Sequence, residues 1–194
     1  GTAANGLVVL YPECVATSDD PRDGGLVHRL DIGTSGALAA ARSRAAWLAA
    51  RRAFTLSAVH KEYLTLTWGA PTGDGCEARL DQRGKRVVVD ATGLPARTSW
   101  RIEQRLGAWS LVRCTAVTGR MHQVRAHLAH AGAPIAGDHL YGGPELAGLV
   151  GFFLHAAVLR FPGGLEAVAP LPEGTERGMI FIFDHEQVRN FWMK

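Results

Sequence analysis

The sequence has few cysteines and lacks the apolar segments of membrane and secreted proteins. Its three cysteines, Cys14, Cys76 and Cys114, are far apart, so neither a zinc knuckle nor a disulfide framework is indicated. No apolar run approaches the ~18 residues of a membrane span, and no charged-then-apolar leader opens the chain. We therefore expect a cytoplasmic protein with reduced thiols and no membrane contact.

Several catalytic motifs are also missing, and their absence narrows the possible chemistry. No two of His122, His127, His130 and His139 form the i, i+4 pair of a helical zinc site, and no H-E-x-x-H occurs. There is no phosphate-binding loop, no glycine-rich dinucleotide loop and no G-x-S-x-G elbow. Metal-dependent, nucleotide-dependent and serine-hydrolase mechanisms are therefore disfavoured.

The composition is that of one ordinary globular domain with a mild positive charge. The chain has 194 residues, of which 47% are hydrophobic and 20% charged, and its formal net charge is +3. A charge of this size permits nucleic-acid binding without proving it. A cluster of arginines suits phosphate contacts or, equally, a solvated helix face; its members are Arg42, Arg44, Arg51 and Arg52.

Hydrophobic periodicity predicts an α+β fold in which strands dominate and helices are interleaved irregularly. Helices are predicted at 44–54, with Ser43 as N-cap, and at 121–131, with Gly132 just past the end. Strands are predicted at 6–10, 37–41, 61–68, 87–89, 99–104, 109–117 and 152–161. The clean alternation within 61–68 indicates a strand that is buried on one face only.

One carboxylate, Asp31, stands shortly after Arg29 and just before a Thr-Ser-Gly turn. His28 and Arg29 could hold Asp31 ionised, because a neighbouring cation lowers the pKa of a carboxylate. An ionised carboxylate in a cleft can attack an electrophilic carbon. The alternative is that Asp31 only caps the turn at 33–35, as aspartates often do.

A second dense segment, 118–128, supplies cations and hydrogen-bond donors. Arg125 shares a helix face with His122 and borders the apolar face, where an unpaired guanidinium is costly. It therefore needs an acidic partner, and Asp31 is the natural candidate. Arg120 is expected at the helix N-terminus, where backbone N–H groups favour anions. The alternative is a polar helix face with purely structural ion pairs.

Tyr63 lies on the polar face of its predicted strand together with Lys61. An aromatic ring in that position could stack on a nucleic-acid base, with Lys61 near a phosphate. The alternative is a partly buried surface tyrosine without a binding role.

These segments together resemble the RluA-type pseudouridine synthases, which modify ribosomal or transfer RNA. Five motifs occur in order: H-R-L-D-x-x-T-S-G at 28–36, K-x-Y at 61–63, T-G-R-x-H-Q-[IV]-R-x-H-L at 118–128, G-x-P-I-x-G-D-x-x-Y-G at 132–142 and L-H-A at 154–156. The resemblance implies the family's catalytic fold, a mixed, mainly antiparallel sheet flanked by helices. It also implies isomerisation of uridine to pseudouridine, in which the N1–C1′ bond breaks and a C5–C1′ bond forms.

The resemblance further implies roles for single residues. Asp31 matches the family's catalytic aspartate, Arg125 the arginine that pairs with it, and Tyr63 the ring that stacks on the target uracil. Arg29 matches a position that can enter the RNA stack as the target nucleotide flips out. The other residues expected to contact RNA are His28, Lys61, Arg120 and His122. The family uses no metal or organic cofactor, and the expected partner is ribosomal or transfer RNA.

We expect a catalytic domain at 26–182, preceded by a poorly defined and shortened segment at 1–25 and followed by a tail of unknown role at 183–194. Relatives carry an N-K-P-x-G strand before H-R-L-D that this chain lacks. Ile32 and Gly33 replace a lysine and an acidic residue that relatives usually carry. Two alternatives to an RNA-uridine isomerase remain. One is a non-catalytic RNA-binding or RNA-folding module that keeps the cleft, and the other is a small-molecule glycosyl-transferring or lyase enzyme.

Overall fold

The computed structural model describes residues 2–171 and is assembled from short elements. Its helices are α1 (Ala3–Leu10), α2 (Arg44–Thr55) and α3 (Gln123–His130), with short 3-10 helices η1 (Pro12–Ala16), η2 (Pro21–Asp23) and η3 (His139–Tyr141). Its strands are β1 (Ser35–Gly36), β2 (His60–Trp68), β3 (Gly75–Cys76), β4 (Leu80–Arg83), β5 (Arg86–Val89), β6 (Thr98–Leu106), β7 (Trp109–Ala116), β8 (Leu154–Arg160) and β9 (Glu166–Val168). No helix in this part of the chain is long and apolar enough to cross a membrane.

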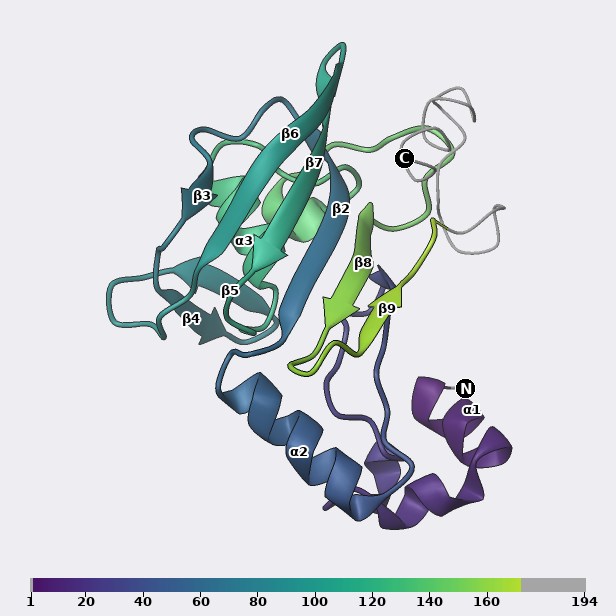
Figure 1. Ribbon diagram of the computed structural model, residues 1–194. Coiled ribbons are helices and arrows are strands. Elements are labelled where there is room, and N and C mark those ends of the chain that lie inside the picture. The colour runs from purple at the N-terminus through teal and green to yellow at the C-terminus, as the bar shows by residue number, and fades with distance from the viewer. Residues whose placement is uncertain (1, 172–194) are drawn as a thin grey trace.

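One large sheet forms the centre of the molecule (Figure 1). Its strands follow the order β1-β8-β2-β7-β6-β3, β9 pairs with β8, and β4 and β5 form a separate hairpin. Among the strands of residues 2–171, only β1 and β8 pair in parallel. α3 covers one face of the sheet, and α1 and α2 lie beyond one end (Figure 1). The predicted α+β fold with a mixed, mainly antiparallel sheet is confirmed.

Hydrophobic packing covers both faces of the central strand β2. On one face, Leu128 of α3 packs against Val112 of β7, and on the other Leu66 packs against Phe153. Every side chain from Leu64 to Thr67 is therefore buried. The hydroxyl of Thr65 donates a hydrogen bond to the carbonyl oxygen of Phe153 at 2.6 Å, which compensates its burial. The prediction of a half-buried strand is wrong here, because alternation does not reveal a layer on the polar face.

The helix predicted after Ser43 is present as α2. The hydroxyl oxygen of Ser43 accepts a hydrogen bond from the backbone N–H of Ala46 at 3.3 Å, as an N-cap does. The buried indole of Trp47 donates from Nε1 to the carbonyl oxygen of Leu26 at 3.0 Å, and Arg51 donates to that of Val27 at 3.2 Å. α2 thereby holds residues 26–27, which lie just before Asp31 in the chain.

Two predicted strands are wrong. Residues 6–10 belong to α1, whose start forms a capping box in which Thr2 and Asn5 each accept a backbone N–H of the other. Residues 37–41 form no strand: only Ser35–Gly36 pairs as a strand with β8, and Ala40 makes an isolated bridge with Leu26. Short apolar runs do not distinguish these outcomes, because local capping and sheet partners decide them.

The hairpin of β4 and β5 packs beside α3, and β4 was not predicted. Leu80 and Val87 belong to one hydrophobic cluster with Ala126 of α3 and with Tyr141. The hydroxyl oxygen of Tyr141 accepts a hydrogen bond from the backbone N–H of Val87 at 2.9 Å. This bond ties the hairpin to η3. β4 has the polar sequence L-D-Q-R, so it gives no hydrophobic alternation to detect.

The expected division into segments stays a prediction, and the expected tail at 183–194 lies outside the described residues. The residues before Leu26 do contact the rest of the protein. Cys14 is fully buried, and the hydroxyl of Thr17 donates to the carbonyl oxygen of Ala41 at 3.3 Å. All three cysteines are free thiols.

Candidate active site

Asp31 begins a tight turn that its surroundings hold in place. The backbone N–H of Thr34 donates to the carbonyl oxygen of Asp31 at 2.9 Å, and Gly33 has φ +95°, which favours glycine at that position of a β-turn. The ring of Phe152 lies so close that a Cβ on Gly33 would be 3.1 Å from it. The carboxylate of Asp31 is 18% exposed, so it is held in place and still accessible.

Gly36 joins this turn to the sheet through an unusually close backbone contact. β1 pairs in parallel with β8, and a Cβ on Gly36 would lie 2.2 Å from the carbonyl oxygen of Ala156. The neighbouring Ser35 is hydrogen-bonded to Nδ1 of His155 at 2.9 Å, while Nε2 of His155 lies 3.0 Å from the carbonyl oxygen of Ala169. Since a carbonyl only accepts, Nε2 carries the proton of His155 and Nδ1 accepts from Ser35.

The guanidinium of Arg125, from α3, contacts two aspartates. Its Nη1 lies 3.3 Å from Oδ2 of Asp31, the partner expected from the sequence. Its Nε and Nη2 make shorter, bidentate bonds to Asp138 at 2.7 and 2.9 Å. Asp138 is fully buried and was not identified as a site residue. The sequence did contain a signal for Asp138: it stands in the G-D-x-x-Y-G motif, and a buried arginine needs an acidic partner.

Two aromatic rings complete the surroundings of Arg125. The guanidinium carbon lies 4.3 Å from the ring centre of Phe152 and 5.1 Å from that of Tyr141. Burial acts to lower the pKa of Arg125, but the hydrogen bonds to Asp138 outweigh it and raise the pKa, so the side chain stays charged. The charged guanidinium thus lies beside the carboxylate of Asp31.

Tyr63 projects from β2 on the face of the sheet that α3 covers, where it packs against the cluster around Val112. Burial raises the pKa of Tyr63 to about 12, and the negative charge of Asp31 acts in the same direction. The phenol is therefore protonated at neutral pH. The structure thus brings Asp31, Tyr63 and Arg125 into one region.

His122 also belongs to this region. Its Nε2 lies 4.0 Å from Oδ2 of Asp31, and its Nδ1 lies 3.1 Å from the hydroxyl oxygen of Tyr141. The helix begins at Gln123, so the helix predicted from residue 121 starts two residues later than expected. Arg29 is exposed and its charge acts on the imidazole of His122, which places Arg29 on the same side of the protein.

Three of the residues expected to contact RNA make hydrogen bonds within the protein, although Arg120 is exposed. His28 stacks on Phe54 at 4.7 Å between ring centres, and its Nε2 accepts from the N–H of Ala39 at 2.9 Å. Lys61 is buried and donates to the carbonyl oxygen of Thr118 at 3.1 Å. Arg120 precedes the first turn of α3 and donates instead to the carbonyl oxygen of Pro95 at 3.0 Å. The spacing of residues along the chain does not show which groups of the folded protein these three side chains contact.

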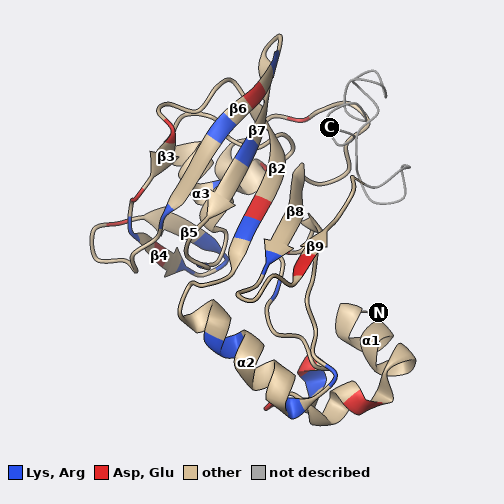
Figure 2. Ribbon diagram, in the orientation of Figure 1, with Lys and Arg blue, Asp and Glu red and all other residues tan. Residues whose placement is uncertain are grey.

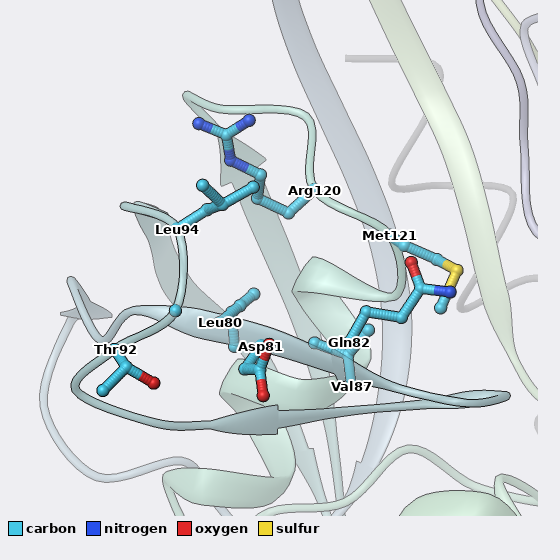
Figure 3. Close-up of a pocket in the computed structure, with 9 residues that line it drawn as sticks. Leu80, Asp81, Gln82, Val87, Thr92, Leu94, Arg120 and Met121 are labelled. Carbon is cyan, nitrogen blue, oxygen red and sulfur yellow. The ribbon is translucent and has the colours of Figure 1, made fainter.

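Arg120 borders a pocket of about 310 Å³ beside the β4–β5 hairpin (Figure 3). Apolar side chains line much of it, among them Leu80, Val87 and Leu94. In Figure 3, Arg120 and Leu94 lie together at one side, whereas Gln82 reaches toward Met121 at the other. Met121 directly precedes His122 in the chain, but neither His122 nor Asp31 lines the pocket.

The arginines of the α2 region are mostly engaged in structure. Arg42 pairs with Glu13 and Arg44 with Asp19, and Arg51 bonds to the backbone, so the cluster is not a row of free cations. Figure 2 shows basic positions on α2 and around β5. At the tip of the hairpin, Lys85 is exposed. Within residues 2–171, no group of three or more His, Cys, Asp or Glu side chains is placed to hold a metal ion.

The structure brings together the aspartate and the arginine that the resemblance to pseudouridine synthases led us to expect. The chain belongs to the RNA pseudouridylate synthase family, whose pattern matches residues 13–130. The resemblance drawn from the five motifs is thereby confirmed.

Curated relatives support the same assignment. Ribosomal large subunit pseudouridine synthase C of Yersinia pestis is 42% identical over 150 residues, covering 70% of this chain and 47% of that protein. Ribosomal large subunit pseudouridine synthase D of Xanthomonas campestris is 35% identical over 201 residues, covering 92% and 60%. The chain therefore spans about half the length of the curated relatives it matches.

Solved structures give the same fold. Human RNA Pseudouridylate Synthase Domain Containing 1 superposes with a TM-score of 0.65 at 26% identity, covering 87% of this chain and 79% of that one. Human RNA Pseudouridylate Synthase Domain Containing 4 also gives a TM-score of 0.65, at 23% identity, which shows the fold alone.

Proposed function

We propose that this chain is the catalytic part of an enzyme that isomerises uridines in ribosomal RNA to pseudouridine, with Asp31 as the catalytic residue. The observation that supports this most directly is the 3.3 Å contact between Asp31 and Arg125, which lie 94 positions apart in the sequence. Ribosomal RNA is favoured over transfer RNA because the curated relatives are named for the large ribosomal subunit. The expected cytoplasmic location stays a prediction.

The reaction conserves every atom of the uridine. The N1–C1′ bond breaks, the uracil turns, a C5–C1′ bond forms, the hydrogen leaves C5, and N1 gains a proton. An ionised Asp31 can act either by adding to C1′ or by abstracting a proton from C2′. Both routes need the carboxylate in its charged form, and the guanidinium of Arg125 lies 3.3 Å from it.

The target nucleotide must leave the RNA stack to reach Asp31, at a cost of roughly a few kcal/mol. We assign Tyr63 to the uracil, since its protonated phenol offers an apolar ring to a neutral base. Exposed Arg29 is the side chain that would replace the extruded base in the stack. Lys61 and His28, which are turned inward, would support these residues from below and are not assigned to the RNA.

The alternative of a non-catalytic RNA-binding module has no structural observation in its favour. Asp31, Tyr63 and Arg125 are all present, and the carboxylate is accessible. Nor does any observation favour a small-molecule enzyme.

The test uses large-subunit ribosomal RNA, transcribed with tritium at C5 of uridine. Formation of the C5–C1′ bond releases this tritium to water. We expect the purified chain to release tritium from ribosomal RNA and to release little from transfer RNA labelled in the same way. A folded chain that binds ribosomal RNA and releases no tritium would instead support the non-catalytic module.

A further inference from the structure

His122 has an uncommon backbone conformation directly before α3. Its φ of 50° and ψ of 20° lie in the left-handed region, which only one other non-glycine residue of the described chain, Ser57, enters. Its side chain does not cap the helix. Such a conformation costs free energy and persists only where the surrounding structure holds it in place. The contacts of the His122 ring are therefore of interest.

The two ring nitrogens of His122 face different partners. Nδ1 lies 3.1 Å from the hydroxyl oxygen of Tyr141, and that oxygen accepts the backbone N–H of Val87 at 2.9 Å. Nε2 lies 4.0 Å from Oδ2 of Asp31. His122 therefore connects the β4–β5 hairpin, through Tyr141, to the carboxylate of Asp31.

These contacts determine which nitrogen of His122 carries the proton. The Tyr141 oxygen already accepts from Val87, so its own proton is available to Nδ1. Burial raises the pKa of Tyr141, so the phenol keeps this proton, and burial lowers the pKa of His122, so the imidazole is neutral near neutral pH. A carboxylate repels a bare nitrogen lone pair, so Asp31 also favours the tautomer with the hydrogen on Nε2.

Asp31 has room for a second donor. Arg125 makes its two shorter bonds to Asp138, and only the 3.3 Å contact reaches Asp31. The titratable and charged groups that face the His122–Asp31 pair are Arg29, Tyr63, Arg125, Asp138 and Tyr141. Of these, Asp138 is already occupied by Arg125, and Tyr63 and Tyr141 are neutral at physiological pH.

We propose that His122 is a positioning residue whose Nε2–H, oriented by Tyr141, supplies the second hydrogen bond to the carboxylate of Asp31 when RNA is bound. The distance of 4.0 Å in the absence of RNA is then shortened as the substrate closes the site. This inference rests on the proposed function, because it assigns His122 to the reaction that Asp31 performs.

The test compares His122→Phe, which has no donor, with His122→Gln, whose amide places an N–H near the position of Nε2. Both substitutions place a non-glycine residue in the left-handed backbone conformation of position 122, so they form a matched pair. Tritium release is measured from ribosomal RNA labelled at C5 of uridine. We expect kcat/KM to fall about tenfold or more in His122→Phe and to recover in His122→Gln. The acidic limb of the kcat/KM profile is expected to move to higher pH in His122→Phe alone.

Tyr141→Phe provides a second test that does not depend on the folding of His122→Phe. It keeps the ring beside Arg125 and removes the hydroxyl, so we expect a smaller loss of kcat/KM, of several fold. If Tyr141 acts through His122, Tyr141→Phe causes no further loss in the His122→Gln background. The glutamine amide has no tautomers, so it does not need Tyr141 to place its hydrogen. Equal additive losses in both backgrounds contradict the proposal, as does a wild-type pH profile and rate in His122→Phe. Absence of tritium release from the wild-type chain contradicts the proposed function instead.

Discussion

The pair of Arg125 and Asp138 fixes the geometry on which the rest of the site depends. Both side chains are buried, and their bidentate bonds orient the guanidinium so that one nitrogen remains for Asp31. Removing one member leaves an unpaired buried charge, which costs far more than the net value of the pair.

We predict that Asp138→Ala lowers the free energy of unfolding by about 3 kcal/mol or more, as breaking a buried pair does. Urea unfolding at neutral pH measures this difference. Glu145→Ala is the control, because Glu145 is 88% exposed and its contact with His139 is 3.9 Å long. That control should change stability by less than about 0.5 kcal/mol. A similar small change in both variants would show that the buried pair does not stabilise the fold.

At this scale the sequence predicted Arg125 and Asp31 but not Asp138. A guanidinium at the core edge needs an acid on physical grounds, and the structure provides two. The sequence could not decide between them, because the choice depends on which loop folds over α3. The inward directions of His28 and Lys61 were missed for the same reason, since a side chain's direction depends on tertiary neighbours.

His28 makes the fold sensitive to acid. Burial, with a contribution from the charge of Lys61, lowers the pKa of His28 to about 4 from an ordinary value of 6.5. Between these pH values the unfolded chain binds a proton that the folded chain does not, so stability present above pH 6.5 is lost as the pH falls toward 4. The neutral ring is required because Nε2 accepts from Ala39.

We predict that His28→Gln, which keeps an acceptor for the Ala39 N–H, removes this part of the acid sensitivity. On lowering the pH from 6.5 to about 4, the wild-type protein should lose on the order of 2 kcal/mol more stability than the variant. Urea unfolding at several pH values gives the two curves. Parallel curves across this range would mean that the buried His28 is not the group responsible.

Among the elements, the two-residue strand β1 pairs in parallel with β8 and directly follows the Asp31 turn. It is the direct link between the Asp31 turn and β8, and its pairing requires the backbones to approach at Gly36. Any side chain there would collide with Ala156, and its φ of 110° also disfavours non-glycine residues.

We predict that Gly36→Ala costs about 3 kcal/mol or more and also abolishes tritium release, because the turn is displaced together with β1. Gly84→Ala is the matched control at the tip of the β4–β5 hairpin, where φ is +62° and nothing lies within 4 Å of the added Cβ. It should cost only about 1 kcal/mol and leave activity intact. Thermal unfolding and the tritium assay distinguish the two, and comparable losses in both variants would contradict the role given to β1.

Long periodic elements were predictable, and short ones were not. α2 and the strands at 99–104 and 109–117 occur where capping and alternation placed them. β4 and β9 escaped because they are short and polar or exposed. Strands were wrongly predicted within α1 and at 37–41, because an apolar run of five residues does not reveal which segments it will pack against.

In the whole molecule, segments from distant parts of the chain meet around Asp31. Four elements each contribute one side chain: β1 with its turn, β2, α3 and η3. The β4–β5 hairpin is connected to them by the hydrogen bond from Val87 to Tyr141. Lys85 is exposed at the tip of this hairpin, and we expect it to contact RNA phosphates.

We predict that binding of ribosomal RNA weakens as salt rises, because phosphate contacts release counterions. Lys85→Ala should reduce the slope of log K against log salt by about 0.7 to 0.9, the value for one phosphate contact. Arg22→Ala is the control, since Arg22 already pairs with Asp20 at 2.6 Å. Filter-binding titrations at several salt concentrations give the slopes. An unchanged slope in Lys85→Ala would remove the hairpin from the RNA interface.

The assignment of catalysis to the carboxylate at position 31 is tested most directly by Asp31→Asn. Asparagine keeps the size of the side chain and can occupy the same turn, so the fold and RNA binding should remain close to those of the wild-type protein. The measurement is tritium release from C5-labelled ribosomal RNA, with RNA affinity determined on the same preparations. We predict undetectable release at near wild-type affinity. Release at the wild-type rate would contradict the assignment of Asp31 as the catalytic residue.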